Sequence, residues 1–151
     1  MNGKCALALC SIMFAVSSAS ATPQFSRAED AIRYRKASFV LMQAQLGRIS
    51  AMINGRQPFD ARAASESAEI VAFLSKLPFE AFSVGTDKGD TRAKAEVWSE
   101  RARFQVEADR AREQLLKLRD AARSGNAEQL KAAFAPAAQA CKSCHQQFRR
   151  D

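Results

Sequence analysis

The sequence predicts an all-α protein that folds as an antiparallel four-helix bundle. Four stretches place apolar side chains at alternating steps of three and four residues, which is the spacing of one face of an α-helix. Glycine, proline and capping residues separate these stretches, and no segment shows the alternation typical of a β-strand. At 151 residues the chain is long enough for one domain with a hydrophobic core.

Residues 1–21 differ from the rest of the chain and are predicted to be a secretory signal peptide. Lys4 precedes an apolar run over residues 6–16, and small residues follow as far as Ala21, where we expect cleavage. The alternative is a short buried helix. Because the run is too short to span a bilayer, we predict no membrane insertion. The mature domain is predicted to comprise residues 22–151 and to be exported to the periplasm.

The first helix is predicted over residues 28–54, between the polar residue Ser26 and the stop signal Gly55. Its bundle-facing row consists of Ile32, Arg35, Phe39, Met42, Leu46, Ile49 and Ile53. A second, mostly small row consists of Ala37, Leu41, Ala44 and Ala51. This second row either meets another copy of the chain or widens the stripe that faces the core.

The second helix is predicted over residues 61–77, with Asp60 as its cap and Pro78 closing it. Its predicted inward face consists of Ala63, Ser67, Ile70, Leu74 and Leu77. Residues 79–93 contain two glycines and are predicted to be a loop. Phe79 and Phe82 in this loop either line a cofactor cavity or only fill the loop.

The third helix is predicted over residues 93–124, and the fourth follows Gly125 with Asn126 as its cap. The inward face of the third helix consists of Val97, Phe104, Ala108, Ala111, Leu115, Leu118 and Ala122. That of the fourth consists of Leu130, Phe134, Ala137, Cys141, Cys144 and Phe148. Pro136 lies within the fourth helix and is expected to bend its axis.

Near the C-terminus, residues 141–145 read Cys-Lys-Ser-Cys-His, which is the attachment pattern of a c-type haem. In such a site both cysteines bind haem c covalently, and the histidine is an axial ligand of the iron. His145 is the only histidine of the chain and is therefore the predicted metal ligand. Because Cys141 and Cys144 lie on the apolar face of the fourth helix, one covalently attached haem is predicted in the bundle core.

Other site chemistries fit the sequence less well. A zinc site needs about four ligands, and carboxylates would have to complete the three of this motif. A thioredoxin-like dithiol expects a βαβ setting, and no strand pattern lies nearby. The net charge of +7 is compatible with an acidic protein partner, whereas an exported protein does not meet nucleic acid. No acid–base residue occupies the seam opposite the haem motif, so we predict that the chain is not an enzyme.

Three stretches resemble the cytochrome c′ family: residues 24–42, residues 85–98 and residues 141–149. Together with the helix spacing, the resemblance covers essentially the whole mature chain. It implies a periplasmic four-helix bundle, usually a homodimer, here through the first two helices. It also implies a five-coordinate, high-spin haem iron that binds nitric oxide and carbon monoxide. Nitric oxide buffering, or electron transfer with a redox partner protein, is the implied role.

The resemblance also implies site roles by matched position. Phe39 lies where the family has an apolar residue over the vacant face of the iron, commonly leucine. Arg35 matches an arginine near a haem propionate, and Arg149 matches the basic residue beside the proximal histidine. The predicted cofactor-binding residues are Cys141, Cys144, His145, Arg35, Phe39 and Arg149. The chain departs from the family at Phe39, at Phe148 for a frequent tyrosine, and at Ala95 for a frequent proline.

The bulk of Phe39 is expected to slow ligand binding on its side of the haem. The resemblance then implies that nitric oxide can end on the proximal face after displacing His145. The alternative is a low-spin electron-transfer cytochrome of the same bundle class with Met42 as the sixth ligand. Arg35 alternatively covers the seam with its stem, and Arg149 alternatively serves only the helix end.

Overall fold

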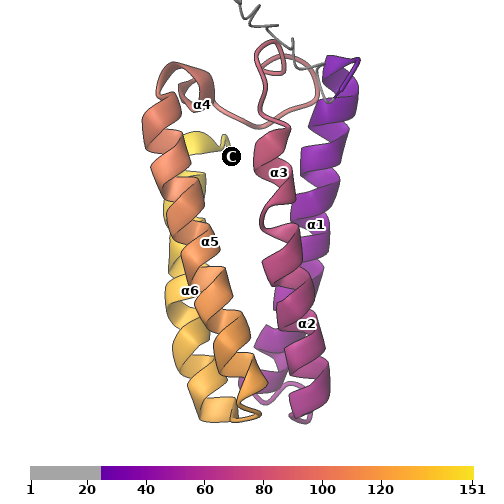
Figure 1. Ribbon diagram of the computed structural model, residues 1–151, viewed down its shortest axis with the longest axis vertical. Coiled ribbons are helices and arrows are strands. Elements are labelled where there is room, and N and C mark those ends of the chain that lie inside the picture. The colour runs from indigo at the N-terminus through magenta and orange to yellow at the C-terminus, as the bar shows by residue number, and fades with distance from the viewer. Residues whose placement is uncertain (1–24) are drawn as a thin grey trace, which may run out of the picture.

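The computed structural model describes residues 25–151, so the predicted signal peptide lies outside the described residues. Four long helices form an up-down-up-down bundle, and the described residues contain no β-sheet (Figure 1). The long helices are α1 (Ala28–Ile53), α2 (Ala61–Leu74), α5 (Arg101–Arg123) and α6 (Ala127–Phe148). The short helices are α3 (Leu77–Glu80) and α4 (Glu96–Ser99). The predicted all-α bundle is therefore confirmed, and no helix in the described range is long and apolar enough to cross a membrane.

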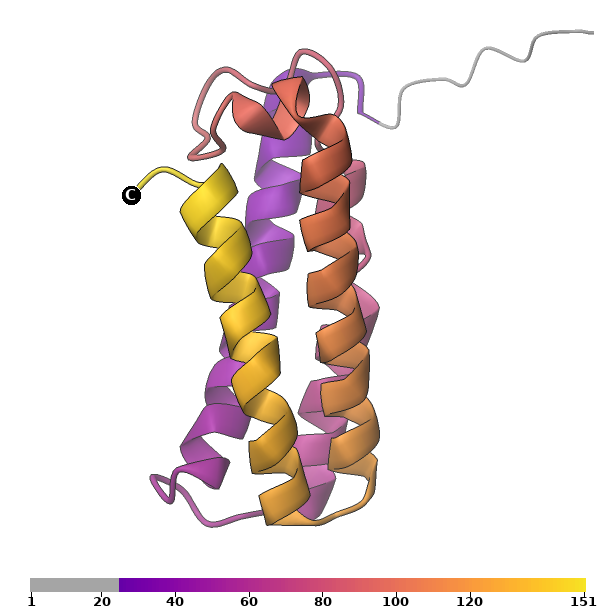
Figure 2. The ribbon, with the colours of Figure 1, turned by 90° about the vertical axis from the view of Figure 1, so that its left-hand side faces the viewer.

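The helices pack as two antiparallel pairs, α1 with α2 and α5 with α6, and α2 joins the pairs by packing along α5. Contacts between α1 and α6 are sparser. Figures 1 and 2 show the α1–α2 and α5–α6 connections at one end of the bundle. The segment between α3 and α5 lies at the opposite end, together with the C-terminal end of α6. We call this end the loop end.

The local signals at the helix ends behave as the sequence predicts. Asp60 and Asn126 each accept hydrogen bonds from two backbone N–H groups in the first turn of the helix that follows, at 2.9 and 3.0 Å. These bonds satisfy donors that a helix start otherwise leaves unpaired. Gly125 adopts a φ of +68° between α5 and α6, a backbone region that favours glycine. The turn at the far end of the bundle is thus fixed locally.

The inward rows predicted for α1, α5 and α6 are confirmed, since every member is buried or half-buried. Apolar side chains from α1, α2, α5 and α6 form one core away from the loop end, which we call the lower core. Its buried members include Met42, Ile49, Val71, Leu118 and Leu130. In the second row, Ala37, Leu41 and Ala44 are exposed and Ala51 is half-buried, so within one chain only the end of this row widens the core-facing stripe.

The second helix differs from its prediction in register and length. Ile70 was expected inside but is 42% exposed, whereas Val71 is fully buried. Two overlapping rows of helical spacing share Ser67 and Leu74, and packing selects the row that also contains small alanines. The helix ends at Leu74, and Pro78 occupies the first turn of α3, where the missing N–H costs nothing.

The third predicted helix is interrupted. The chain is helical over α4, breaks at Glu100 (φ −114°, ψ 45°) and resumes as α5. Residues 93 and 94, expected to begin the helix, are not helical, and the segment 92–94 instead pairs with the end of α6. The Lys94 N–H donates to the Phe148 carbonyl at 2.9 Å, and the Arg150 N–H donates to the Arg92 carbonyl at 2.8 Å. This long-range pairing replaces the first helical turn.

Arg35 of α1 fastens the loop end to the bundle. Its side chain is buried, and Nη1 donates to the Ala81 carbonyl and to Thr86 Oγ1, both at 2.9 Å. Nη2 donates to the Thr86 carbonyl and to Thr91 Oγ1, both at 2.8 Å. Four of the five guanidinium N–H donors are thus bonded to one segment of the chain. We call these bonds the Arg35 clamp.

The guanidinium of Arg35 also stacks on aromatic rings. Its central carbon lies 4.4 Å from the centroid of Phe82 and 5.6 Å from that of Trp98, within the range of cation–π attraction. Burial lowers the pKa of Arg35 to about 10, so the group remains charged at neutral pH. The clamp therefore positions both the 81–91 segment and the rings that this segment carries.

We expect Arg35→Met to lower the free energy of unfolding by about 3 kcal/mol, because it leaves buried acceptors in the 81–91 segment unpaired. Urea denaturation of the mature protein measures this difference. Arg33→Met, on the exposed side of the same helix, is the control and should change stability by less than about 0.5 kcal/mol. Equal stabilities of the two variants would show that the clamp does not hold the loop end.

Candidate haem site

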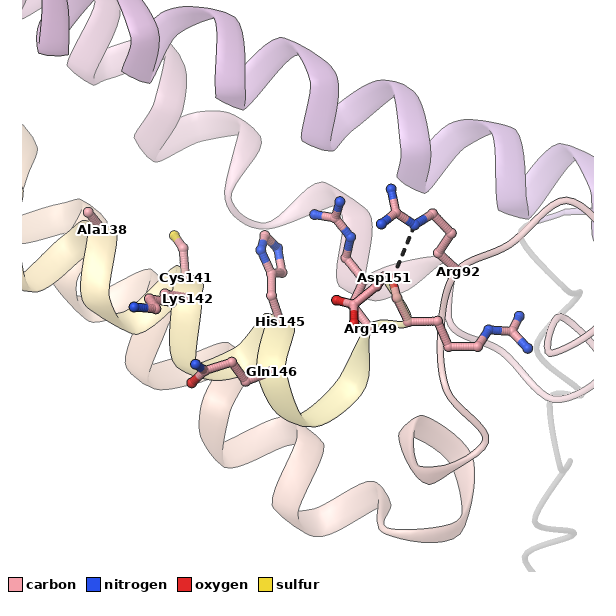
Figure 3. Close-up of a pocket in the computed structure, with 9 residues that line it drawn as sticks. Arg92, Ala138, Cys141, Lys142, His145, Gln146, Arg149 and Asp151 are labelled. Carbon is pink, nitrogen blue, oxygen red and sulfur yellow. Dashed lines mark hydrogen bonds between the residues drawn. The ribbon is translucent and has the colours of Figure 1, made fainter.

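The predicted attachment residues share one face of α6. The spacing of Cys141, Cys144 and His145 places them on adjacent turns, and Figure 3 shows the Cys141 and His145 side chains on the same side of the helix. These two side chains line a pocket of about 430 Å³. The other residues lining it are Arg92, Ala138, Lys142, Gln146, Arg149, Arg150 and Asp151. The motif therefore opens onto a hollow at the loop end.

Cys144 packs against a cluster of aromatic side chains, which we call the aromatic cluster. Its members are Phe39, Phe79, Phe82, Val97, Trp98, Phe104, Phe148, Ala93 and Cys144. Ring centroids of Phe104 lie 5.0 Å from Phe82 and 5.2 Å from Phe148, with edge-to-face tilts. Phe79 lies in α3 and not in the predicted loop, and both Phe79 and Phe82 belong to the same cluster as Cys144. An apolar wall beside the thiols suits a flat apolar macrocycle.

The two thiols lie in a partly buried, apolar environment that shifts their pKa values. Burial raises the pKa of the Cys144 thiol to about 11, and the nearby charge of Glu107 and coupling to Cys141 raise it further in the same direction. Burial also raises the pKa of Cys141. The two cysteines form no disulfide in the described part of the chain. Both sulfur atoms are therefore available to form thioether bonds with a haem.

Zinc coordination finds no further support. Within residues 25–151, no group of three or more histidine, cysteine, aspartate or glutamate side chains is arranged to hold a metal ion. His145 in contrast has the properties of a haem ligand. Burial lowers its pKa, and the positive charges of Arg149 and Arg92 act in the same direction. A neutral imidazole has the free nitrogen lone pair that binds a metal. The donor set therefore fits haem c.

Arg149 lies at the point where α6 ends. Its backbone N–H donates to the His145 carbonyl at 2.9 Å, and its φ and ψ of −124° and 135° are those of an extended chain. It also forms an isolated antiparallel bridge with Ala93. The structure thus places Arg149 close to His145 and next to the segment that the Arg35 clamp holds.

The α1 residues of the predicted site separate into different environments. Phe39 is half-buried and contacts both the aromatic cluster and the lower core, with its ring 6.0 Å from that of Phe79 in an edge-to-face contact. Met42, one turn further, is 6% exposed and is a member of the lower core. Arg35, one turn earlier, uses its guanidinium group for the four hydrogen bonds of the Arg35 clamp. Of these three side chains, Phe39 and Arg35 reach the rings around Cys144.

Several residues near the site were not anticipated from the sequence. The hydroxyl groups of Thr86 and Thr91 accept hydrogen bonds from Arg35. The positive charge of Arg92 lowers the pKa of His145. The negative charge of Glu107 raises the pKa of Cys144. The Oε2 atom of Glu107 is buried without a hydrogen-bond partner in the described part of the chain. The threonines lie in a segment read as a loop, and Glu107 follows no helical apolar row. No pattern in the sequence marks any of them.

Comparisons with known proteins bear directly on this site. The family model described as cytochrome c′ matches residues 30–149. A cytochrome c′ of Rubrivivax gelatinosus is 45% identical over 127 residues, which cover 83% of this chain and 98% of that protein. A cytochrome c′ of Alcaligenes xylosoxydans xylosoxydans is 36% identical and covers 84% of this chain and 98% of that protein.

Solved structures agree with the sequence relatives. The crystal structure of the Rubrivivax gelatinosus cytochrome c′ matches with a TM-score of 0.82 at 44% identity, over 84% of this chain and all of that one. A nitric oxide complex of a cytochrome c′ variant from Alcaligenes xylosoxidans matches with a TM-score of 0.80 at 34% identity, over 85% and 99% of the two chains. The chain therefore belongs to the cytochrome c′ family, and Cys141 and Cys144 are the attachment points of its haem c.

Proposed function

We propose that this chain is a periplasmic haem protein that binds nitric oxide and carbon monoxide at a five-coordinate, high-spin iron. His145 is the one axial ligand from the protein, and Phe39 covers the opposite face. The observation that carries this proposal is the position of Phe39 in the same aromatic cluster as Cys144. Nitric oxide complexes among the similar structures support it. The periplasmic location rests on the signal peptide predicted over residues 1–21.

The surroundings of Phe39 favour small neutral ligands. Among the side chains of the aromatic cluster, those packed near Phe39 are rings and small apolar groups. Burying water or an anion beside such groups is costly, because no hydrogen-bond donor or acceptor replaces those of bulk water. Nitric oxide and carbon monoxide do not incur that cost. Selectivity on this side of the haem therefore comes from the exclusion of polar ligands, and the chain serves to buffer nitric oxide or to transfer electrons.

Phe39 also limits the access of ligands to the face of the iron that it covers. Its ring is wedged between Phe79 and the lower core, so it must move before a ligand enters on that side. Slow binding there leaves the His145 side as the second route for nitric oxide, with displacement of His145. Arg149, at the end of the same helix turn, is placed to influence that route through its charge.

Two exposed apolar surfaces support a homodimer through the first two helices. Val40 and Leu41 on α1 are 64% and 53% exposed, and Ile70 and Phe73 on α2 are 42% and 66% exposed. Neighbouring helices that both expose large apolar side chains are typical of a protein–protein interface. A second copy of the chain, related by a twofold axis, would cover the α1 and α2 surfaces of both subunits.

We expect Phe39→Ala to speed carbon monoxide binding to the ferrous protein by about tenfold or more, which corresponds to about 1.4 kcal/mol of the barrier. Flash photolysis or stopped-flow absorption measures the association rate. Phe59→Ala, in the turn between α1 and α2, is the control and should leave the rate unchanged. An unchanged rate in the Phe39 variant would remove this side chain from the access route.

Dimerisation is tested by placing a charge on α1. We expect Leu41→Glu to convert a dimer to a monomer in sedimentation velocity, because twofold symmetry brings two buried carboxylates into one interface. Val106→Glu on α5, where Val106 is 65% exposed, is the matched control and should remain dimeric. A Leu41→Glu variant that sediments like the wild type would exclude this part of α1 from an interface.

A further inference from the structure

Cations surround the opening of the haem pocket, and four of them form what we call the basic rim: Arg92, Lys94, Lys142 and Arg150. Arg92, Lys142 and Arg150 line the pocket itself. The Lys94 Nζ donates to the carbonyl of Gln146, another lining residue, at 2.9 Å. One acidic side chain, Asp151, lies among them. The rim therefore carries a clear excess of positive charge.

The rim is held in place by contacts with the backbone. Arg92 Nε donates to the Arg150 carbonyl at 3.1 Å, and Arg150 Nη2 donates to the Thr91 carbonyl at 2.7 Å. Because carbonyl groups are neutral, these contacts fix the cations without cancelling their charge. Backbone pairing between residues 92–94 and the end of α6 holds the segments that carry them.

Elsewhere on the surface some cations form ion pairs with neighbours, whereas others, such as Arg56 and Lys131, form none within the described residues. Arg62, Arg103 and Lys117 each pair with a glutamate one turn away. No rim cation forms an ion pair with a carboxylate within residues 25–151. Potentials of exposed cations add where their separations are within about one Debye length, roughly 10 Å at 0.1 M salt. The four cations of the rim, which gather around one pocket, therefore reinforce one another most at low salt.

We infer that the basic rim is the docking surface for an acidic electron-transfer protein. This inference rests on the proposed function, since it assigns a partner to the haem site. The rim surrounds the pocket that contains Cys141 and His145, so a partner bound there approaches the site of the redox centre. Complementary charge at such a surface mainly raises the rate of association and orients the encounter.

A protein surface suits the rim better than an anionic membrane does. Surface attachment to lipid combines cations with apolar side chains that enter the bilayer. Among the described residues, the large exposed apolar side chains are Val40, Leu41, Phe59, Ile70, Phe73, Val84 and Val106. None of them lines the pocket. The rim instead presents positioned charges around the haem site, which matches an acidic protein surface.

The test uses reduced flavodoxin, a small acidic flavoprotein, as the electron donor to the ferric haem-loaded protein. Stopped-flow absorption follows haem reduction at rising salt. We expect the second-order rate constant to fall about tenfold or more between about 0.01 and 0.3 M ionic strength, as steered association does. The double variant Lys142→Glu/Arg150→Glu should be about tenfold slower than the wild type at low salt and equal to it at high salt.

The matched control is Arg56→Glu/Lys131→Glu, which makes the same change in net charge at the opposite end of the bundle. Arg56 lies between α1 and α2, and Lys131 lies in the first turns of α6. The control should keep the rate within about twofold of the wild type at low salt. A changed reduction potential would slow the rim variant at every salt concentration, so recovery at high salt identifies docking.

Three results would overturn the inference: a rate insensitive to salt, equal slowing of the rim and control variants, or slowing that persists at high salt. Binding of the wild type, but not the rim variant, to phosphatidylglycerol vesicles with unchanged flavodoxin kinetics would assign the rim to a membrane instead. Carbon monoxide binding to each ferrous protein is recorded in parallel. A wild-type protein that does not bind carbon monoxide would count against the proposed function. Normal carbon monoxide binding together with a salt-independent rate of haem reduction would count against docking alone.

Discussion

A buried guanidinium organises the end of the bundle where the haem site lies. Removing Arg35 from water is costly, and the hydrogen bonds to Ala81, Thr86 and Thr91 offset that cost. Because these partners lie in one segment, the bonds fix its path across α1. The same segment continues into residues 92–94, which pair with the end of α6. One charged side chain of α1 thus constrains the helix that carries the haem motif.

The chemistry of the site follows from what the fold buries and what it leaves charged. The aromatic cluster packs against Cys144 and gives Phe39 its apolar surroundings. Unpaired cations lie on the other side of the motif, around the pocket that His145 lines. The side chains around Phe39 are therefore apolar, whereas those around the pocket are mostly charged.

Much of the fold could be predicted because its signals are local. Caps at Asp60 and Asn126 and the apolar rows of α1, α5 and α6 depend on residues within a few turns. The haem motif is equally local. The predictions were wrong where contacts between residues far apart in the sequence determine the structure. Ile70 and Val71 belong to two helical rows of similar quality, and packing against α5 selects one of them. The segment 92–94 is not helical because its backbone groups form hydrogen bonds with residues 148–150 instead. The role of Arg35 beside a propionate stays a prediction, since its observed partners lie within the chain.

We propose that the iron of this protein receives one ligand from the chain, His145, and none from the α1 side. The alternative ligand on α1 is the sulfur atom of Met42, and this side chain is buried in the lower core. Electron paramagnetic resonance of the resting ferric protein at neutral pH distinguishes the two ligand sets. With His145 as the one protein ligand, we expect the signals of high-spin iron. A low-spin spectrum of histidine and methionine ligation that disappears in Met42→Leu would contradict it.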